Sequence, residues 1–350
     1  MKNIMHKLFI LLSAFIIIIA GSSLAYAMQK GTKKLPITQF YSPKHTNAVW
    51  DWSNPLNRKD SVITDTAVLL KSHQINTVYT DVSIYESISE KSDRAQRNLQ
   101  IEQLQKLLSN YIKIMNNNGI AVIASAGDSA WSKPSEQHIA VSLLKFVQDY
   151  NGTHSNKFNG MEFDIEAYNQ KGFPEASMTE KSLVLMEYLD TVDALAGTTE
   201  KYIASSNDKK FELGFSIPYW FDNENKNIES LSWHDKTGPA LFHIMDRLNK
   251  LPQSNVVVMA YRNAAQGNDG IIFHSRTEIE YAQSQARKVR VIIGIETTNV
   301  EPKKITFFGK TQTELSSETT LLTEAFNNSG VLGGIAINDL PGYTAVINNK

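Results

Sequence analysis

The amino-acid sequence predicts an α/β protein whose main part is a single (β/α)8 TIM barrel. Three observations predict this fold: eight short apolar runs rich in β-branched residues, helix-period stretches between them, and a length of 350 residues that accommodates a barrel with long loops. Buried strands that alternate with amphipathic helices pair in parallel through helical crossovers. A doubly wound open sheet has the same element order and is the alternative, although no glycine-rich phosphate loop follows the first expected strand.

The expected strands share a short apolar core and are separated by polar or helix-period segments. In chain order they are Ala48–Trp52, Ile75–Asp81, Ile120–Ala126, Phe158–Ala167, Phe211–Tyr219, Val256–Tyr261, Val289–Glu296 and Val331–Asn338. Between them, apolar residues recur with helical spacing over residues 101–115 and 183–192. No linker, repeat or low-complexity tract divides residues 46–350, so they are expected to form one catalytic domain after a polar lead-in over residues 28–45.

Residues 1–27 have the pattern of a secretory signal peptide. Lys2 and Lys7 precede an apolar run over residues 8–20, and Ala25-Tyr26-Ala27 forms a small-x-small cleavage site. The apolar run is short for a membrane-spanning helix, and an uncleaved N-terminal anchor is the alternative. The chain is therefore expected to be exported to the periplasm or the extracellular space, without membrane association after cleavage.

The composition excludes several classes of function. The chain has no Cys, which excludes a disulfide scaffold and any Cys-ligated zinc or iron–sulfur site. Its 35 Lys and Arg residues do not outnumber its 36 Asp and Glu residues, so no nucleic-acid partner is expected. The eight His residues show no metal-ligand spacing, and neither a metal nor a cofactor is expected. The sequence does not identify a protein partner.

Three acids alternate with apolar residues along the fourth expected strand. Because strand side chains alternate with period two, Met161, Phe163 and Ile165 face one side of the strand. The residues on the other side are Glu162, Asp164 and Glu166. If the apolar side meets the surrounding helices, the acids point into the barrel, with the last one at the catalytic mouth.

Stacked carboxylates inside a barrel have a high energetic cost. Burial of an unpaired carboxylate costs roughly several kcal/mol, and like charges at short range raise the pKa values of some of the groups. A proton held on Glu166 near neutral pH is what a general acid needs. Two alternatives are a half-exposed edge strand whose acids face water, and an oxygen-only site for a hard cation.

The segment from Asn159 to Glu166, N-G-M-E-F-D-I-E, resembles the strand-4 signature D-G-x-D-x-D-x-E of glycoside hydrolase family 18, the chitinases and related endo-N-acetylglucosaminidases. Gly160, Asp164 and Glu166 match this signature, and Asn159 and Glu162 depart from it conservatively. Motifs of other strands are similar to the family's in the same order. They are Ser125-Ala126-Gly127, Met259-Ala260-Tyr261, Ile292-Ile293-Gly294 and Gly333-Gly334.

The resemblance implies catalytic roles for three residues. Glu166 would protonate the glycosidic oxygen, and Asp164 would orient the 2-acetamido group of the substrate. Tyr261 would hydrogen-bond the acetamido carbonyl as it attacks the anomeric carbon. No enzyme nucleophile is then required, and the anomeric configuration is retained. The expected partner is an N-acetylhexosamine-containing glycan, such as chitin, peptidoglycan or an N-glycan core.

Two departures from the family pattern keep a second mechanism open. Asn338 stands where the family usually has a strand-8 Trp, and Arg262 follows Tyr261 where the family has an acid. Glu296 ends the seventh expected strand, so an acid from strand 4 and an acid from strand 7 meet at the mouth. A double-displacement glycosidase would use Glu166 as acid/base and Glu296 as nucleophile, with Arg262 pairing with Glu296. A structural salt bridge is the alternative for Glu296.

Further residues are expected to bind substrate. Asp51 and Asp81 end strands 1 and 2 and are expected to hydrogen-bond the substrate at the rim. Glu162, Arg262 and Asn338 are also expected to bind substrate. Trp131 and Trp220 are the preferred stacking residues, with core packing as the alternative for each. The other aromatic candidates are Trp50, Trp52, Tyr79, Trp233 and Tyr343. A non-catalytic carbohydrate-binding barrel, or a barrel with unrelated chemistry, stays an alternative function.

Overall fold

A computed structural model describes residues 45–54, 58–223, 228–286 and 289–349. The expected signal peptide, and the lead-in up to residue 44, lie outside the described residues and stay predictions. Within the described part of the chain, no helix is both long and apolar enough to cross a membrane.

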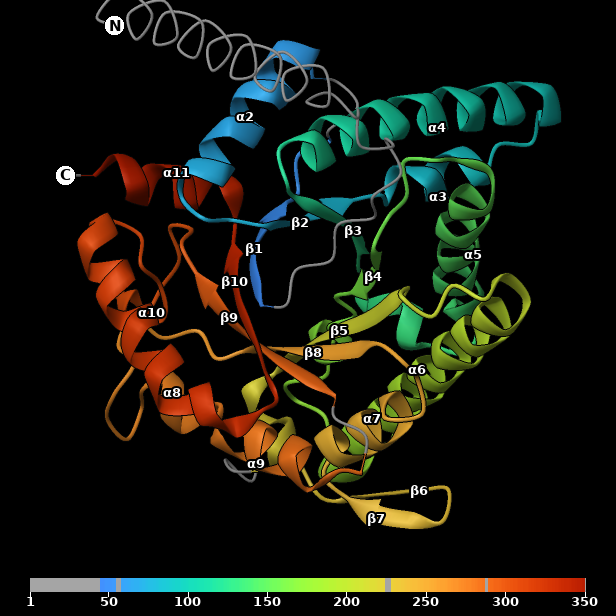
Figure 1. Cartoon of the computed structure of the whole chain (residues 1–350). Helices are drawn as coiled ribbons and strands as arrows, with labels where there is room; N and C mark the ends of the chain where they lie inside the picture. The colour runs from blue at the N-terminus through green and yellow to red at the C-terminus, as the bar shows by residue number, and fades with distance from the viewer. Residues whose placement is uncertain (1–44, 55–57, 224–227, 287–288, 350) are drawn as a thin grey trace, which may run out of the picture. The chain divides into compact units, whose positions relative to one another are not determined.

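Eight strands form a closed barrel in the centre of Figure 1. They are β1 (Thr46–Asp51), β2 (Thr77–Asp81), β3 (Ala121–Ala126), β4 (Gly160–Phe163), β5 (Glu212–Pro218), β8 (Ser254–Met259), β9 (Arg290–Glu296) and β10 (Leu332–Asn338). All neighbouring barrel strands are parallel, and β1 pairs with both β2 and β10, so that Val49 lies between Val78 and Ile337. This closure confirms the predicted TIM barrel and excludes the open sheet.

Helices follow the strands and surround the barrel (Figure 1). They are α2 (Asp60–Ser72), α3 (Ile84–Ser89), α4 (Arg94–Asn117), α5 (Gln137–Thr153), α6 (Met178–Ser206), α7 (Ala240–Leu248), α8 (Ile271–His274), α9 (Arg276–Ser284), α10 (Gln312–Phe326) and α11 (Leu340–Asn348). A two-stranded hairpin, β6 (Leu231–Trp233) and β7 (Lys236–Gly238), lies between β5 and α7. The helices cover the outward faces of the strands with apolar side chains.

The inside of the barrel contains a separate apolar cluster. Its buried members come from six strands and are Ala48, Trp50, Tyr79, Ile123, Val257, Ile292 and Ala336. These positions fix which strand residues point inward, because alternate residues of each strand share a face. Trp52 packs against the same cluster, so the inward series of the first strand continues past the end of β1.

Two of the predicted strands end at least two residues earlier than expected, next to catalytic candidates. β4 ends at Phe163 rather than Ala167, and β8 ends at Met259 rather than Tyr261. The backbone N–H of Asp164 still donates to the Ala126 carbonyl at 3.0 Å, after which the chain turns into a 3-10 segment at Ala167–Asn169. The acids after β4 therefore lie on irregular backbone at the carboxyl end of the barrel.

An ion pair lies inside the opposite end of the barrel. Arg290, at the start of β9, donates to Glu212, at the start of β5, at 2.5 Å, and Asn255 donates to the same carboxylate oxygen at 2.6 Å. Replacing Glu212 by Leu leaves the guanidinium without this partner and is expected to lower the free energy of unfolding by about 2–3 kcal/mol. This value is at the low end for buried pairs because the Arg290 side chain is 26% exposed.

Urea unfolding at pH 7 checks this prediction, with a double variant as the control. Glu212→Leu combined with Arg290→Met removes both charges, and we expect it to be more stable than Glu212→Leu alone. Equal stabilities of the single and double variants would show that the uncompensated Arg290 charge contributes nothing.

Candidate active site

Glu162 is the innermost acid of the fourth strand and is fully buried inside the barrel. Its carboxylate accepts hydrogen bonds from the Ser125 hydroxyl at 2.6 Å, from the Ser216 hydroxyl, and from the Trp50 indole N–H at 3.5 Å. Burial raises the pKa of Glu162, and the serine hydroxyls act in the opposite direction. The two serines, on β3 and β5, were not identified from the sequence, although each occupies an inward-facing strand position.

Asp164 lies two residues after Glu162, nearer to the mouth of the barrel. Its Oδ1 atom is buried and accepts no hydrogen bond from any described residue. Burial raises the pKa of Asp164 well above its ordinary value, and the charges of Glu162 and Glu166 raise it further. Burial and the two neighbouring carboxylates thus both favour the protonated form of Asp164, whose Oδ1 has no hydrogen-bond partner among the described residues.

Asp164 gives a testable pH dependence of stability. In the unfolded chain the carboxyl ionises near about pH 3.9, whereas in the folded protein it keeps its proton to higher pH. Between these two pKa values the folded state binds one more proton, so the free energy of unfolding falls as pH rises, by at most about 1.4 kcal/mol per pH unit. The stabilisation is complete below the unfolded-state pKa and is lost as pH rises through the folded-state pKa.

Asp164→Asn removes this titration. We expect the variant to gain stability relative to the wild type as pH is raised from about 4 to 8. Urea unfolding of both proteins across this range measures the difference. Parallel pH profiles for the two proteins would contradict the raised pKa of Asp164.

Glu166 follows the end of β4 and is half-buried. Its two carboxylate oxygens accept hydrogen bonds from the Tyr168 hydroxyl and from the Asn169 side-chain amide, the latter at 2.5 Å. The Tyr168 ring packs edge-to-face against Trp220, with ring centroids 5.1 Å apart. The sequence analysis did not identify Tyr168 and Asn169 as site residues. Their closeness to Glu166 in the sequence could have indicated them, because the 3-10 turn after Glu166 brings both side chains back to its carboxylate.

Tyr261, after β8, is the residue around which the candidate acids gather. Burial raises the pKa of Tyr261 well above its ordinary value. The carboxyl groups that raise it further in their ionised forms are those of Asp164, Glu296, Glu166 and Glu162. The carboxyl ends of β4, β8 and β9 thus bring four acids within electrostatic range of one phenol, which keeps its proton and can donate it in a hydrogen bond.

Glu296, at the end of β9, is 5% exposed and held by two N–H donors. The Asn338 side-chain amide donates to Oε2 at 2.7 Å, and the backbone N–H of Thr298 donates to Oε1 at 2.6 Å. The expected Arg262–Glu296 pair is wrong. The Arg262 guanidinium instead binds Asp269 at 2.7 Å and the Tyr261 carbonyl at 2.8 Å, because the loop after β8 brings Asp269 back to it.

Asp51 does not lie at the rim of the barrel as expected. It shares the outward face of β1 with Val49, is fully buried towards the helices, and forms an ion pair with Arg58 at 2.7 Å. Burial raises the pKa of Asp51. Asp81 is half-buried at the end of β2, where its carboxylate accepts from the Ser83 backbone N–H at 2.8 Å and stabilises the turn before α3.

The two tryptophans preferred for stacking differ in their surroundings. Trp131 is 2% exposed and packs in the main core, which leaves almost none of its ring accessible to a sugar. The structure therefore favours core packing over sugar stacking for Trp131. Trp220 is half-buried beside Tyr168 and through it lies next to Glu166. Of the two preferred stacking residues, Trp220 is the one that lies at the mouth.

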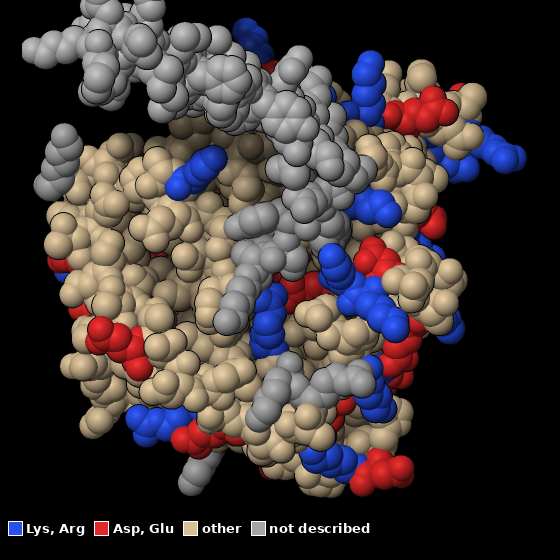
Figure 2. Space-filling model, viewed as in Figure 1, with Lys and Arg blue, Asp and Glu red and all other residues tan. Residues whose placement is uncertain are grey.

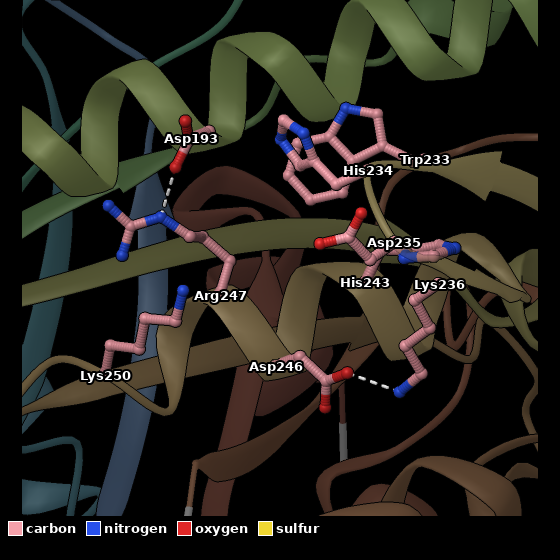
Figure 3. Close-up of a pocket in the computed structure, with 9 residues that line it drawn as sticks. All are labelled: Asp193, Trp233, His234, Asp235, Lys236, His243, Asp246, Arg247 and Lys250. Atoms are coloured by element: carbon pink, nitrogen blue, oxygen red, sulfur yellow. Dashed lines mark hydrogen bonds and ion pairs between the residues drawn. The ribbon is translucent and has the colours of Figure 1, made fainter.

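A cavity of about 410 Å³ lies on the flank of the barrel, between α6, the β6–β7 hairpin and α7 (Figure 3). Its lining side chains are Asp193, Trp233, His234, Asp235, Lys236, His243, Asp246, Arg247 and Lys250. Arg247 binds Asp193, and Lys236 binds Asp246, across this cavity. Trp233, one of the aromatic candidates, lines this cavity and so lies away from the mouth, whereas none of the expected catalytic residues lines it.

Charges of both signs are interspersed on the face shown in Figure 2, and no broad patch of one sign covers it. Among the described residues, no group of three or more His, Asp or Glu side chains is arranged to hold a metal ion. The carboxyl, phenol and amide groups at the mouth can transfer protons and form hydrogen bonds.

Comparison with solved structures shows the same barrel in carbohydrate-active enzymes. A family 18 chitinase from Cycas revoluta in complex with (GlcNAc)3 has a TM-score of 0.52 and 10% identity, with 84% of this chain and 95% of that chain covered. A plant class V chitinase mutant from the same plant, also with (GlcNAc)3, has a TM-score of 0.52, 10% identity, and coverage of 85% and 96%. The catalytic domain of a β-amylase from Paenibacillus polymyxa has a TM-score of 0.51, 8% identity, and coverage of 84% and 92%.

No protein-family model and no curated protein matches the sequence. At these identities the structural likeness shows the TIM-barrel fold, shared with chitinases of glycoside hydrolase family 18 and with a β-amylase.

Proposed function

We propose that this chain is an exported glycosidase that cleaves an N-acetylhexosamine-containing glycan with retention, using Glu166 as the general acid. The observation that carries the proposal is the set of acids within electrostatic range of Tyr261: Asp164, Glu166 and Glu296 at the carboxyl end of the barrel, and Glu162 beneath them inside it. In barrels of this kind catalytic residues come from the carboxyl ends of several strands. The chitinases with this fold bind (GlcNAc)3, which supports a glycan of that class.

In the proposed reaction, Glu166 gives its proton to the glycosidic oxygen as the bond to the leaving sugar breaks. The carbonyl oxygen of the substrate's 2-acetamido group attacks the anomeric carbon and forms a cyclic intermediate. Water then gives a proton back to the Glu166 carboxylate as it opens this intermediate from the other face, which restores the acid. Tyr261 donates a hydrogen bond to the acetamido group, since its raised pKa keeps the phenol protonated. Asp164, with its buried and unpartnered Oδ1, orients the same group.

A second mechanism is favoured by the surroundings of Glu296. Two N–H donors hold its carboxylate in a fixed position at the end of β9, where a nucleophile of this mechanism would stand. In double displacement Glu296 would form a covalent glycosyl intermediate. Incubation with a 2-fluoro glycoside, followed by mass spectrometry of the peptide containing residue 296, separates the two mechanisms: an adduct supports displacement by Glu296, and its absence in an active enzyme supports acetamido participation.

The proposed function is tested with a panel of chitotriose, peptidoglycan fragments and N-glycan cores. Wild type should release reducing ends from at least one member, and Glu166→Gln should not. Saturable binding without cleavage by the wild type would instead support a carbohydrate-binding barrel. If the wild type neither binds nor cleaves any member, the proposal is overturned.

Export is part of the same proposal and rests on residues 1–27. Cleavage after Ala27 would leave Met28 as the first residue of the mature protein. Intact-mass analysis of protein recovered outside the cytoplasm checks this position. Recovery of the full-length chain in the membrane fraction would support an uncleaved anchor.

A further inference from the structure

Trp52 continues the inward-facing side of the first strand beyond its end. It follows Ala48 and Trp50 at two-residue spacing, and its ring lies almost parallel to that of Trp50, with centroids 6.4 Å apart and an interplanar angle of 10°. Trp50 is 2% exposed, whereas Trp52 is half-buried. Trp52 therefore lies one layer nearer to the mouth than the ring that fills the barrel beneath it.

Asn338 connects Trp52 to Glu296. The Trp52 indole N–H donates to Asn338 Oδ1 at 2.8 Å, while Asn338 Nδ2 donates to Glu296 Oε2 at 2.7 Å. The amide has only one useful orientation, because a flip would oppose its oxygen to a carboxylate and its NH2 group to an indole N–H. One side chain thus fixes both an aromatic ring and a candidate catalytic acid.

The placement of these groups suits a sugar ring. The C–H face of a pyranose packs against an aromatic face, while its hydroxyl and acetamido groups need hydrogen-bonding partners beside that face. A half-buried indole ring beside a hydrogen-bonded carboxylate offers both.

We propose that Trp52 is the stacking platform for the sugar ring bound next to Glu296, and that Asn338 is a positioning residue that orients Trp52 and Glu296 together. This inference rests on the proposed function and assigns the part of the site that recognises the ring. In this inference the apolar face of the sugar is recognised by Trp52, which follows β1. The neighbouring position at the end of β10 holds the polar amide of Asn338 and offers no aromatic ring.

The test measures binding in the Glu166→Gln background, where the panel glycans stay intact. Trp52→Ala should weaken binding of chitotriose, or of whichever panel glycan binds, by at least about tenfold, as measured by calorimetry. Tyr281→Ala is the matched control, because Tyr281 is also a half-buried aromatic residue that stacks on another ring, Phe242, with centroids 3.8 Å apart, and is bonded to a side-chain oxygen, Asp246 Oδ1, at 2.7 Å, but lies on α9 outside the barrel. It should leave binding unchanged.

The positioning role of Asn338 needs a separate readout. With Glu166 intact, Asn338→Leu should raise KM through Trp52 and, in the double-displacement mechanism, also lower kcat through Glu296, whereas Trp52→Ala should act mainly on KM. The effects of the two substitutions on KM should be less than additive. Once Trp52→Ala has removed the ring, Asn338→Leu can no longer raise KM by leaving that ring unoriented. Circular dichroism and Tm show that each variant is folded.

The outcomes distinguish this inference from the proposed function. If the wild type binds or cleaves a panel glycan and Trp52→Ala does so equally well, Trp52 is no platform and the inference is overturned. If kcat and KM of folded Asn338→Leu equal those of the wild type, the positioning role is overturned. If the wild type neither binds nor cleaves any panel glycan, the proposed function itself fails.

Discussion

Replacing Glu166 by Gln is expected to lower kcat on a natural glycan by between about 10²- and 10⁴-fold, the range that one positioned acid contributes. The glutamine amide cannot give a proton to the glycosidic oxygen. It can still accept from Asn169 Nδ2 and donate to the Tyr168 hydroxyl, so the local fold should persist. Initial rates of reducing-end release measure the loss.

The leaving group supplies a sharper measurement of the same role. An aryl glycoside whose phenolate departs without a proton should lose far less activity in Glu166→Gln than a glycan does. Glu175→Gln is the matched control, since Glu175 is exposed in the loop before α6, and its activity should equal that of the wild type. Equal losses of activity on the aryl glycoside and on the glycan would show that Glu166 is not the general acid. Its role would then be limited to substrate binding.

The fold could be predicted from the sequence because its signals are local and repeated. Each strand appears as a short apolar run, and period-two alternation correctly places Glu162 inside the barrel and Phe163 outside. Burial on both faces of a parallel barrel makes the strands nearly continuous apolar runs, so an inward-facing acid is visible against that background.

The hydrogen-bond and ion-pair partners of the site residues could not be predicted, because most of these partners come from the loops that follow the strands. Asp51 ends its strand as Glu296 does, yet its position in the alternation turns it towards Arg58 on the outside. Arg262 lies next to Tyr261 in sequence, but its side chain follows the loop to Asp269. The link between Trp52 and Asn338 joins residues 286 positions apart, which no local pattern encodes.

Gly127→Ala is expected to disrupt the geometry of the site and to lower the free energy of unfolding by about 3 kcal/mol or more. A Cβ atom at Gly127 would lie 1.9 Å from the carbonyl oxygen of Asp164, and backbone atoms on both sides leave no flexible side chain to move away. The segment after β4 must then shift, and Asp164 and Glu166 shift with it. Urea unfolding measures the stability, and kcat on the same glycan measures the displacement.

Gly152→Ala is the same chemical change at a place where the structure predicts the opposite sign. A Cβ at Gly152, in the last turn of α5, meets no atom within 4 Å, so Ala should stabilise the helix, by about 0.5 kcal/mol. Its activity should equal that of the wild type, since no site residue contacts it. Equal stability and activity of both alanine variants and the wild type would contradict the close approach of Gly127 to the segment after β4. The acids that follow β4 would then lack the backbone contact that holds them at the mouth.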